Sequence, residues 1–238
     1  MLGRMSVDAE RMRDVRSLVA GSRGVLFDFD GPVCRLFPRD SSRSVADELR
    51  GLVAEAGYEG LLTAEEKADT DPHLVLRAVH RALRHGDDLV AALEARVSER
   101  EVEAAEQALP TPGAERFIRR LAARGVRLAV VTNNSARAAS HYLEAKGLLG
   151  CFDAVHGRTR DLDRMKPHPD IVRRALVSLG LGSEEAVMIG DSPVDVAAAR
   201  EAGVGFIGYG RNELKESRLR WAGAGVVVDS YALFLEEA

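Results

Sequence analysis

Short apolar runs alternate with amphipathic stretches along most of the chain. The runs have the length and continuity of buried parallel strands, and they lie at residues 25–27, 126–131, 154–155, 186–189, 204–207 and 223–229. The stretches between them have helical spacing, at residues 114–124, 135–146, 169–179 and 195–202. This alternation predicts an α/β fold, a doubly wound parallel sheet with right-handed crossovers and helices on both faces.

One long segment departs from this alternation. Between residues 37 and 109 we find helical spacing only, and no convincing strand. The apolar positions predict three helices in it: one over 45–53 that Gly57 ends, one that Asp71 and Pro72 open, and one that begins at Asp87 or Asp88. An N-cap followed by a proline in the first turn is typical of a helix start.

The chain is therefore expected to have two parts. Residues 1–36 and 110–238 form an α/β core, and residues 37–109 form a small all-helical domain inserted into it. Residues 1–21 carry apolar positions at helical spacing and are interpreted as an extra N-terminal helix.

Four polar motifs stand out against this background, and three of them directly follow predicted strands. In open α/β sheets, ligands bind beyond the carboxyl ends of the strands. Side chains far apart in sequence are thus expected to meet at one sheet edge. The motifs are Asp28-Phe29-Asp30-Gly31, Thr132-Asn133-Asn134, Lys166-Pro167 and Gly190-Asp191-Ser192-Pro193-Val194-Asp195.

The order of these motifs resembles the haloacid dehalogenase superfamily, whose members are mostly phosphatases. The resemblance extends from about residue 24 to the last residues. It is specific because four motifs recur in order, and it points to the phosphoglycolate phosphatase-like subgroup. The resemblance implies a Rossmannoid core, and it identifies the insert as the helical cap that such members carry between their first and second motifs.

The resemblance also implies roles for the catalytic residues. Asp28 is the nucleophile that forms an aspartyl phosphate, and Asp30 is the general acid and base. Thr132, with backbone N–H groups beside it, holds phosphate oxygens, and Lys166 is a point charge on the nucleophile and the transferred group. Taken singly, the two aspartates could cap a loop, Thr132 could cap its own helix, and Lys166 could be a solvated surface residue.

A magnesium ion is the implied cofactor. Its ligands are a carboxylate oxygen of Asp28, the main-chain carbonyl of Asp30, and Asp191, because Mg²⁺ prefers hard oxygen ligands. Asp195 is either an outer ligand that acts through water or a plain charge at a helix N-terminus. Both interpretations stay open.

Residues that contact the substrate are expected near the first motif and in the cap. Gly31 permits a tight turn and close approach to a ligand, and Asn133 and Arg35 complete the predicted substrate-binding set. Pro32 stands where relatives usually have threonine or valine, which rigidifies the path to the cap. Further cap candidates are Arg39, Arg77, His80, Arg81 and Arg84; for Arg81 and Arg84, a solvated charged stripe is the favoured interpretation.

Composition limits the alternatives. The formal charge of −4 and the pI near 5.9 give no basic footprint for nucleic acid. Cys34 and Cys151 lack ligand spacing, which argues against zinc and against a disulfide framework. No apolar stretch approaches the ~20 residues that cross a bilayer, and the start lacks a signal-peptide pattern. We expect a cytoplasmic monomer or homodimer whose partner is a small phosphorylated substrate.

The leading interpretation is a magnesium-dependent phosphatase for a small phosphorylated metabolite. A sugar phosphomutase of the same family would use Asp28 and Asp30 alike. A dehalogenase fits less well, because it needs neither the second aspartate nor the metal. A regulatory or binding protein that kept the fold without turnover is the alternative from another class.

Overall fold

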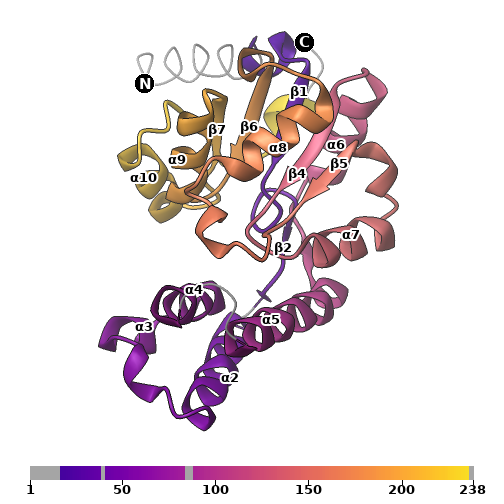
Figure 1. Cartoon of the computed structure of the whole chain (residues 1–238). Helices are drawn as coiled ribbons and strands as arrows, with labels where there is room; N and C mark the ends of the chain where they lie inside the picture. Colours follow the sequence, from indigo (N-terminus) through magenta and orange to yellow (C-terminus); the bar gives the residue numbers. More distant parts are fainter. Residues whose placement is uncertain (1–16, 39–40, 84–87, 236–238) are drawn as a thin grey trace.

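The structure, a computed structural model, describes residues 17–38, 41–83 and 88–235. Figure 1 shows an α/β part that holds both ends of the described chain and, below it in this view, a group of helices. Two segments of the chain connect the two parts. Residues 17–21 are helical, and the rest of the predicted N-terminal helix lies outside the described residues.

Six parallel strands form the central sheet in the order β5-β4-β1-β6-β7-β8. They are β1 (Gly24–Phe27), β4 (Arg127–Val131), β5 (Ala154–His156), β6 (Ala186–Gly190), β7 (Gly205–Tyr209) and β8 (Val226–Val228). Strand β1 lies between β4 and β6, with Phe27 opposite Val130 and Ile189. All six predicted strands are present, and the chain runs outward from β1 in both directions, which makes its carboxyl end a topological switch point.

Helices cover both faces of this sheet. They are α6 (Ala114–Ala123), α7 (Ala136–Ala145), α8 (Asp170–Leu179), α9 (Pro193–Ala202), α10 (Glu213–Trp221) and α11 (Ala232–Leu235). Alternating strand residues supply the two cores: Phe27 packs with α6 and α7, and its neighbour Leu26 packs with α8 and α9. Helices α10 and α11 were not predicted.

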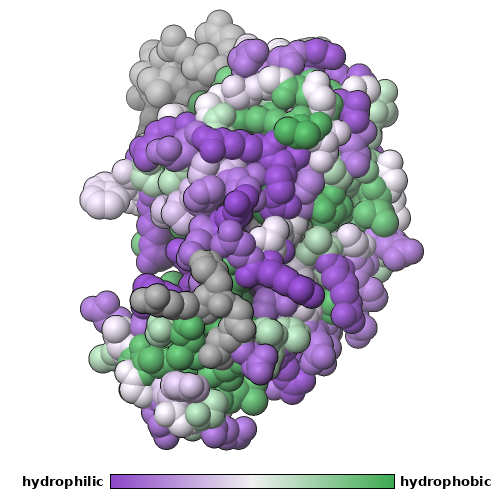
Figure 2. Space-filling model, viewed as in Figure 1, coloured by the Kyte–Doolittle hydropathy of each residue, from purple (hydrophilic) through white to green (hydrophobic). Residues whose placement is uncertain are grey.

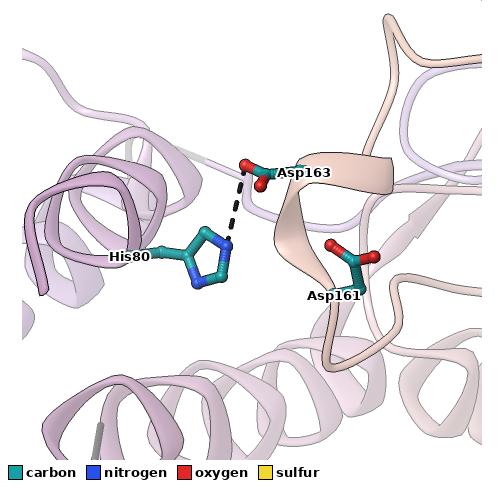
Figure 3. A group of neighbouring side chains, drawn as sticks. All are labelled: His80, Asp161 and Asp163. Atoms are coloured by element: carbon teal, nitrogen blue, oxygen red, sulfur yellow. Dashed lines mark ion pairs between the residues drawn. The ribbon is translucent and has the colours of Figure 1, made fainter. Parts of the chain in front are cut away.

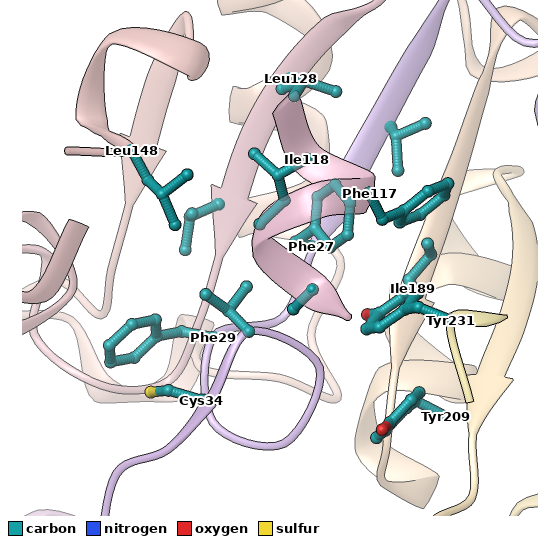
Figure 4. Close-up of a cluster of buried hydrophobic side chains, with 14 of the residues drawn as sticks. Phe27, Phe29, Cys34, Phe117, Ile118, Leu128, Leu148, Ile189, Tyr209 and Tyr231 are labelled. Atoms are coloured by element: carbon teal, nitrogen blue, oxygen red, sulfur yellow. The ribbon is translucent and has the colours of Figure 1, made fainter. Parts of the chain in front are cut away.

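An aromatic stack ties Tyr231, the residue before α11, to α6 and to β7 (Figure 4). The ring of Tyr231 stacks on Phe117 and on Tyr209, with 5.0 Å between centroids in each pair. Phe27 meets Phe117 edge-on at 6.1 Å. Such pairs contribute to stability beyond the burial of the aromatic surface.

The cap, defined here as helices α2–α5, lies between two short antiparallel strands, which we call the first and second hinge strands. The helices are α2 (Ser41–Glu55), α3 (Ala64–Ala68), α4 (Pro72–Leu83) and α5 (Asp88–Gln107), and the strands are β2 (Cys34–Arg35) and β3 (Leu109–Pro110). The three predicted cap helices are present. The prediction of no strand up to Leu109 is wrong at that residue, because two-residue strands are too short to show a periodicity.

The cap and the core are packed against each other. Leu162 and Met165, from the core loop before Lys166, are buried in the hydrophobic cluster of the cap. Helix α5 also lies along α7 of the core (Figure 1). The loop that carries Lys166 is thus packed against the cap.

Hydrophilic residues cover the centre of this face of the core, and apolar residues gather in part of the cap and in patches at the upper end and right edge of the core (Figure 2). Among the described helices, none is both long enough and apolar enough to cross a membrane.

Candidate active site

The first motif turns sharply at Gly31, directly after β1. Gly31 has φ +112°, and a Cβ built on it would lie 2.2 Å from Oδ2 of Asp191. A glycine is therefore required here for two reasons, the backbone conformation and the close approach of the fourth motif. The sequence predicted a tight turn with close approach to a ligand, and the structure adds this approach of Asp191.

Two distant side chains hold the same loop. The hydroxyl of Thr111, just past the second hinge strand, donates to the carbonyl oxygen of Gly31 at 2.6 Å. The hydroxyl of Tyr231 donates to the carbonyl oxygen of Pro32 at 3.0 Å. These buried bonds fix the segment that carries Asp28 and Asp30.

Lys166 joins two of the motifs through its ammonium group. Nζ lies 2.9 Å from Oδ1 of Asp28 and 2.6 Å from Oδ1 of Asp195, and it donates to the carbonyl oxygen of Val131 at 3.0 Å. The side chain is only 2% exposed. Burial lowers its pKa, but the two carboxylates outweigh burial and raise it above the usual lysine value. Lys166 is thus a buried cation and not a solvated surface residue. A cis peptide bond joins it to Pro167.

Both carboxylate oxygens of Asp195 are occupied. Oδ1 accepts from Lys166, and Oδ2 accepts from the backbone N–H groups of Asp191 and Ser192 at 3.2 and 3.1 Å and from the Ser192 hydroxyl at 2.6 Å. Asp195 is therefore the third helical residue of the capping box of α9, whose N-cap is Ser192, and at the same time the counter-ion of Lys166.

Burial dominates the electrostatics of the other aspartates. Burial, followed by the charge of Asp195, raises the pKa of Asp28 well above the usual aspartate value, against the lowering effect of Lys166. Burial also raises the pKa of Asp30, whose Oδ1 accepts from the backbone N–H of Leu36 at 2.9 Å. The pKa of Asp191 is raised to about 6, again mainly by burial. Anionic carboxylates in this arrangement need a nearby cation.

The donor set fits a hard divalent cation. One carboxylate oxygen from each of Asp28, Asp191 and Asp195 lies within 4.8 Å of the others, and carboxylate oxygens are the ligands that Mg²⁺ prefers. The ammonium of Lys215, on α10, contacts Oδ2 of Asp191. Lys215 was not among the predicted site residues, since nothing in its local pattern connects it to the four motifs.

Asn133 of the second motif is hydrogen-bonded to the backbone of Lys166 in the third. The side-chain amide of Asn133 donates to the carbonyl oxygen of Lys166 at 3.1 Å, and its Oδ1 accepts from the Lys166 N–H at 2.8 Å. Thr132 is 1% exposed, and its hydroxyl donates to Oδ1 of Asn134 at 3.0 Å. The N-cap of α7 is Ser135 and not Thr132, so the alternative in which Thr132 caps that helix is wrong.

These groups line a cavity of about 320 Å³ between the core and the cap. The predicted residues that line it are Asp28, Asp30, Thr132, Asn133, Lys166 and Asp191. Asp195 lies behind Lys166, fully buried. Arg35 is exposed on β2 and is not among the described lining residues, and its part in substrate binding stays a prediction.

The other cap candidates have different environments. Arg81 binds Glu66 of α3 at 2.7 Å, and Arg77 is half-buried. His80 is buried on α4 and faces the core loop, where its Nε2 lies 3.6 Å from Oδ1 of Asp163 (Figure 3). Arg39 and Arg84 lie outside the described residues.

A second buried ion pair joins the cap to the core, and the sequence analysis missed it. Glu101 of α5 accepts from Nη1 of Arg158 at 2.6 and 2.8 Å, from the Ser135 N–H at 2.8 Å and from the Asn134 amide at 3.0 Å. It also bonds Nε2 of His73, on α4, at 2.8 Å. The side chains of Glu101 and Arg158 are both fully buried.

One signal in the sequence could have located this pair. Val90, Leu93 and Val97 form the apolar stripe of α5, and Glu101 continues the same stripe at helical spacing. A carboxylate at a core position of a helix requires a partner. Which residue supplies that partner follows only from the tertiary structure.

Comparisons with known proteins agree with this site. The family model for haloacid dehalogenase-like hydrolases matches residues 23–203. A phosphoglycolate phosphatase of Rhodospirillum rubrum is 41% identical over 126 residues, which is 51% of this chain and only about half, 49%, of that protein. A phosphoglycolate phosphatase of Yersinia pseudotuberculosis is 32% identical over 203 residues, covering 80% of this chain and 82% of the relative.

The fold comparison leads to the same group. The crystal structure of CbbY from Rhodobacter sphaeroides in complex with phosphate matches with a TM-score of 0.66 and 25% identity, over 89% of this chain and 95% of that chain. The predicted resemblance, the α/β fold class with a helical cap and the assignment as a hydrolase are therefore confirmed. The chain belongs to the haloacid dehalogenase-like hydrolase family and is similar to its phosphoglycolate phosphatase-like members.

Proposed function

We propose that the protein is a magnesium-dependent phosphatase that hydrolyses a small phosphorylated metabolite through a phosphate ester on Asp28. The observation that carries the proposal is the buried ammonium of Lys166, which lies 2.9 Å from Oδ1 of Asp28 at the base of the cavity. An ammonium there offsets negative charge on the nucleophile and on an incoming phosphate. The names of the relatives and the phosphate in CbbY support the same substrate chemistry.

The first half of the reaction transfers the phosphoryl group to the protein. A carboxylate oxygen of Asp28 attacks phosphorus, and the bond from phosphorus to the ester oxygen breaks. Asp30 gives its proton to the leaving oxygen, which departs as an alcohol. Thr132 and Lys166 hold the oxygens of the transferred group during this step.

The second half restores the protein. Asp30 takes a proton from a water molecule while the water oxygen attacks phosphorus. The bond between phosphorus and Asp28 breaks, inorganic phosphate leaves, and Asp30 is protonated again. The tight turn at Gly31, held by Thr111 and Tyr231, keeps the two aspartates in fixed relation through both steps.

Asp28 and Asp191, with the main-chain carbonyl of Asp30, would hold the magnesium ion, and Asp195 would support them from behind. When bound, the ion lets an anionic carboxylate approach an anionic phosphate. A phosphomutase would share the first half-reaction, and a binding protein would share neither. Cytoplasmic location and a monomeric or homodimeric state stay predictions.

Release of phosphate from 4-nitrophenyl phosphate, with magnesium and with excess chelator, tests the proposal. We expect turnover that chelation stops and that magnesium restores. The variant Asp28→Asn is the matched control, since it keeps the size of the side chain. Undiminished turnover in chelator would contradict the metal assignment, and turnover by Asp28→Asn would contradict the nucleophile. Binding without any release would leave the binding protein as the better interpretation.

A further inference from the structure

The cavity has two chemically different walls. The core wall carries the charged groups described above. The cap and its first hinge supply Phe37, Ser42, Thr70, Asp71, Pro72 and His73. Among the described lining residues, Lys166 is the single lysine or arginine, and its ammonium already bonds Asp28 and Asp195. A ligand therefore meets hydroxyls, an imidazole and a carboxylate beyond its phosphate.

The imidazole of His73 is held in one orientation. Its Nε2 lies 2.8 Å from Oε1 of Glu101, and a carboxylate only accepts, so Nε2 carries a proton in this bond. Nδ1 is the nitrogen that remains, and it lies 3.4 Å from Oδ1 of Asp71, another lining residue. The ring thus turns one polar atom toward the cap and the other toward the cavity lining.

Glu101 also fixes the position of His73 relative to the core, because its carboxylate binds both. The same carboxylate accepts from the Ser135 N–H and from the Asn134 amide, next to Thr132, and from Arg158. Arg158 in turn donates to the carbonyl oxygen of Asn133 at 3.2 Å. The position of His73 relative to the phosphate-binding loop is therefore set by direct hydrogen bonds, and Glu101 is a positioning residue.

Resting on the proposed phosphatase function, we propose that the organic part of the substrate carries several hydroxyl groups, as in a phosphorylated polyol or sugar. Ser42, Thr70, Asp71 and His73 would bind these hydroxyls. A carboxylate accepts from two or more hydroxyls, and an imidazole nitrogen pairs with one. A second anionic group, such as the carboxylate of phosphoglycolate, would instead face Asp71, and no lysine or arginine other than Lys166 is among the described lining residues to balance it, which disfavours binding.

Steady-state kinetics with three probes tests this. The probes are ribose 5-phosphate, phosphoglycolate and 4-nitrophenyl phosphate. We expect kcat/KM for ribose 5-phosphate to exceed that for phosphoglycolate at least about tenfold, because a site built for hydroxyls rejects analogues that lack them. A higher kcat/KM for phosphoglycolate would overturn the proposal.

Variants locate the selectivity in the cap. His73→Gln should lower the ratio of kcat/KM for ribose 5-phosphate to that for 4-nitrophenyl phosphate about tenfold, mainly through KM. Thr70→Val should lower the same ratio, and it provides a second readout if the His73 variant folds poorly. His141→Gln, a half-exposed histidine on α7, is the matched control and should leave the ratio unchanged. Equal losses on all probes would show that His73 has no part in selectivity.

Failure of this proposal can be told from failure of the proposed function. Absence of any hydrolysis of 4-nitrophenyl phosphate would overturn the phosphatase assignment and, with it, this inference. Hydrolysis of that probe together with a preference for phosphoglycolate would overturn the hydroxyl recognition alone. Calorimetric titration of the Asp28→Asn variant with ribose 5-phosphate and with phosphoglycolate measures the binding preference without turnover. Tighter binding of phosphoglycolate than of ribose 5-phosphate there would also overturn the proposal.

Discussion

Two centres of buried charge, one around Lys166 and one around Arg158, differ in what they leave available to a ligand. In the catalytic centre, Lys166 lies between Asp28 and Asp195, and Asp28 still lines an open cavity. In the interface centre, the side chains of Arg158 and Glu101 are fully buried, they hydrogen-bond to the segment that begins α7, and neither is among the described residues that line the cavity. The difference indicates chemistry at the first pair and attachment of the cap at the second.

The electrostatics show the same contrast. Burial raises the pKa of Asp28, so its carboxylate is incompletely balanced within the protein. Burial alone would also raise the pKa of Glu101, but the hydrogen bond from His73 and the charge of Arg158 lower it to about 2. A fully balanced pair contributes to stability, whereas an incompletely balanced carboxylate keeps capacity for a ligand. Substitutions in the two centres should therefore affect different measurements.

The largest expected effect lies in the catalytic centre. Asp28→Asn removes the nucleophile, and we expect the rate of phosphate release to fall at least about a thousandfold. The free energy of unfolding, measured with urea, should change little or rise, because a buried carboxylate with a raised pKa is replaced by a neutral amide. Activity of Asp28→Asn near that of the wild type would show that Asp28 is not the nucleophile, and that the catalytic centre does not differ from the interface centre in this way.

How far sequence predicts these two centres follows from their residues. The catalytic centre lies at strand ends, and strand ends carry local signals: apolar runs before Asp28, Thr132 and Asp191. The topology then brings those ends together. Lys166 has no strand directly before it, and it was located only because the four motifs occur in order. For Asp195, the structure shows the charge at a helix N-terminus, since one oxygen accepts from the N–H groups at the start of α9, and the role of outer metal ligand stays a prediction.

The interface centre could not be derived in the same way. Glu101 and Arg158 lie on different parts of the chain, 57 residues apart, and no motif connects them. The elements that the sequence did not predict also lack a local signal. The hinge strands β2 and β3 pair two residues each, and α10 is weakly amphipathic, so local periodicity carries little information about them.

Removing the cation of the interface centre should cost the most stability. Arg158→Met leaves Glu101 buried without its guanidinium partner, and we expect a loss of about 3–5 kcal/mol in the free energy of unfolding. Urea denaturation measures it. The double variant Arg158→Met/Glu101→Gln should recover part of the loss, because no unpaired charge remains.

A surface pair provides the control for this measurement. Arg220 binds Glu216 at 2.8 Å on α10, with both side chains about one-third exposed or more. Arg220→Met should therefore change the free energy of unfolding by less than about 1 kcal/mol. An equal effect of the two substitutions would show that burial of the Arg158 pair has no special consequence.

The pH dependence of stability should report on Glu101 itself. Its folded-state pKa, about 2, lies below the ordinary value of 4.5. The stabilisation is therefore fully present above about pH 4.5 and is lost as the pH falls toward 2. Glu101→Gln should cost about 3 kcal/mol at pH 7, and the difference from wild type should shrink at pH 3. The exposed Glu99→Gln serves as control, and a difference that is constant from pH 7 to pH 3 would contradict the depressed pKa.

The smallest expected effect concerns Lys215 and sharpens the account of the catalytic centre. Its ammonium contacts Oδ2 of Asp191, one of the carboxylates that would hold magnesium. A divalent cation at Asp191 must compete with this ammonium and is repelled by it, since like charges in a partly buried site interact strongly. We therefore expect Lys215→Met to tighten magnesium binding by about threefold to tenfold, measured by calorimetric titration in the absence of substrate. Lys67→Met, on the exposed surface of α3, is the control and should leave the affinity unchanged. Weaker magnesium binding by Lys215→Met would mean that Lys215 orients Asp191 as a metal ligand. Lys166 and Lys215 would then both assist the metal in balancing the charge of the catalytic centre, and Lys215 would not compete with it.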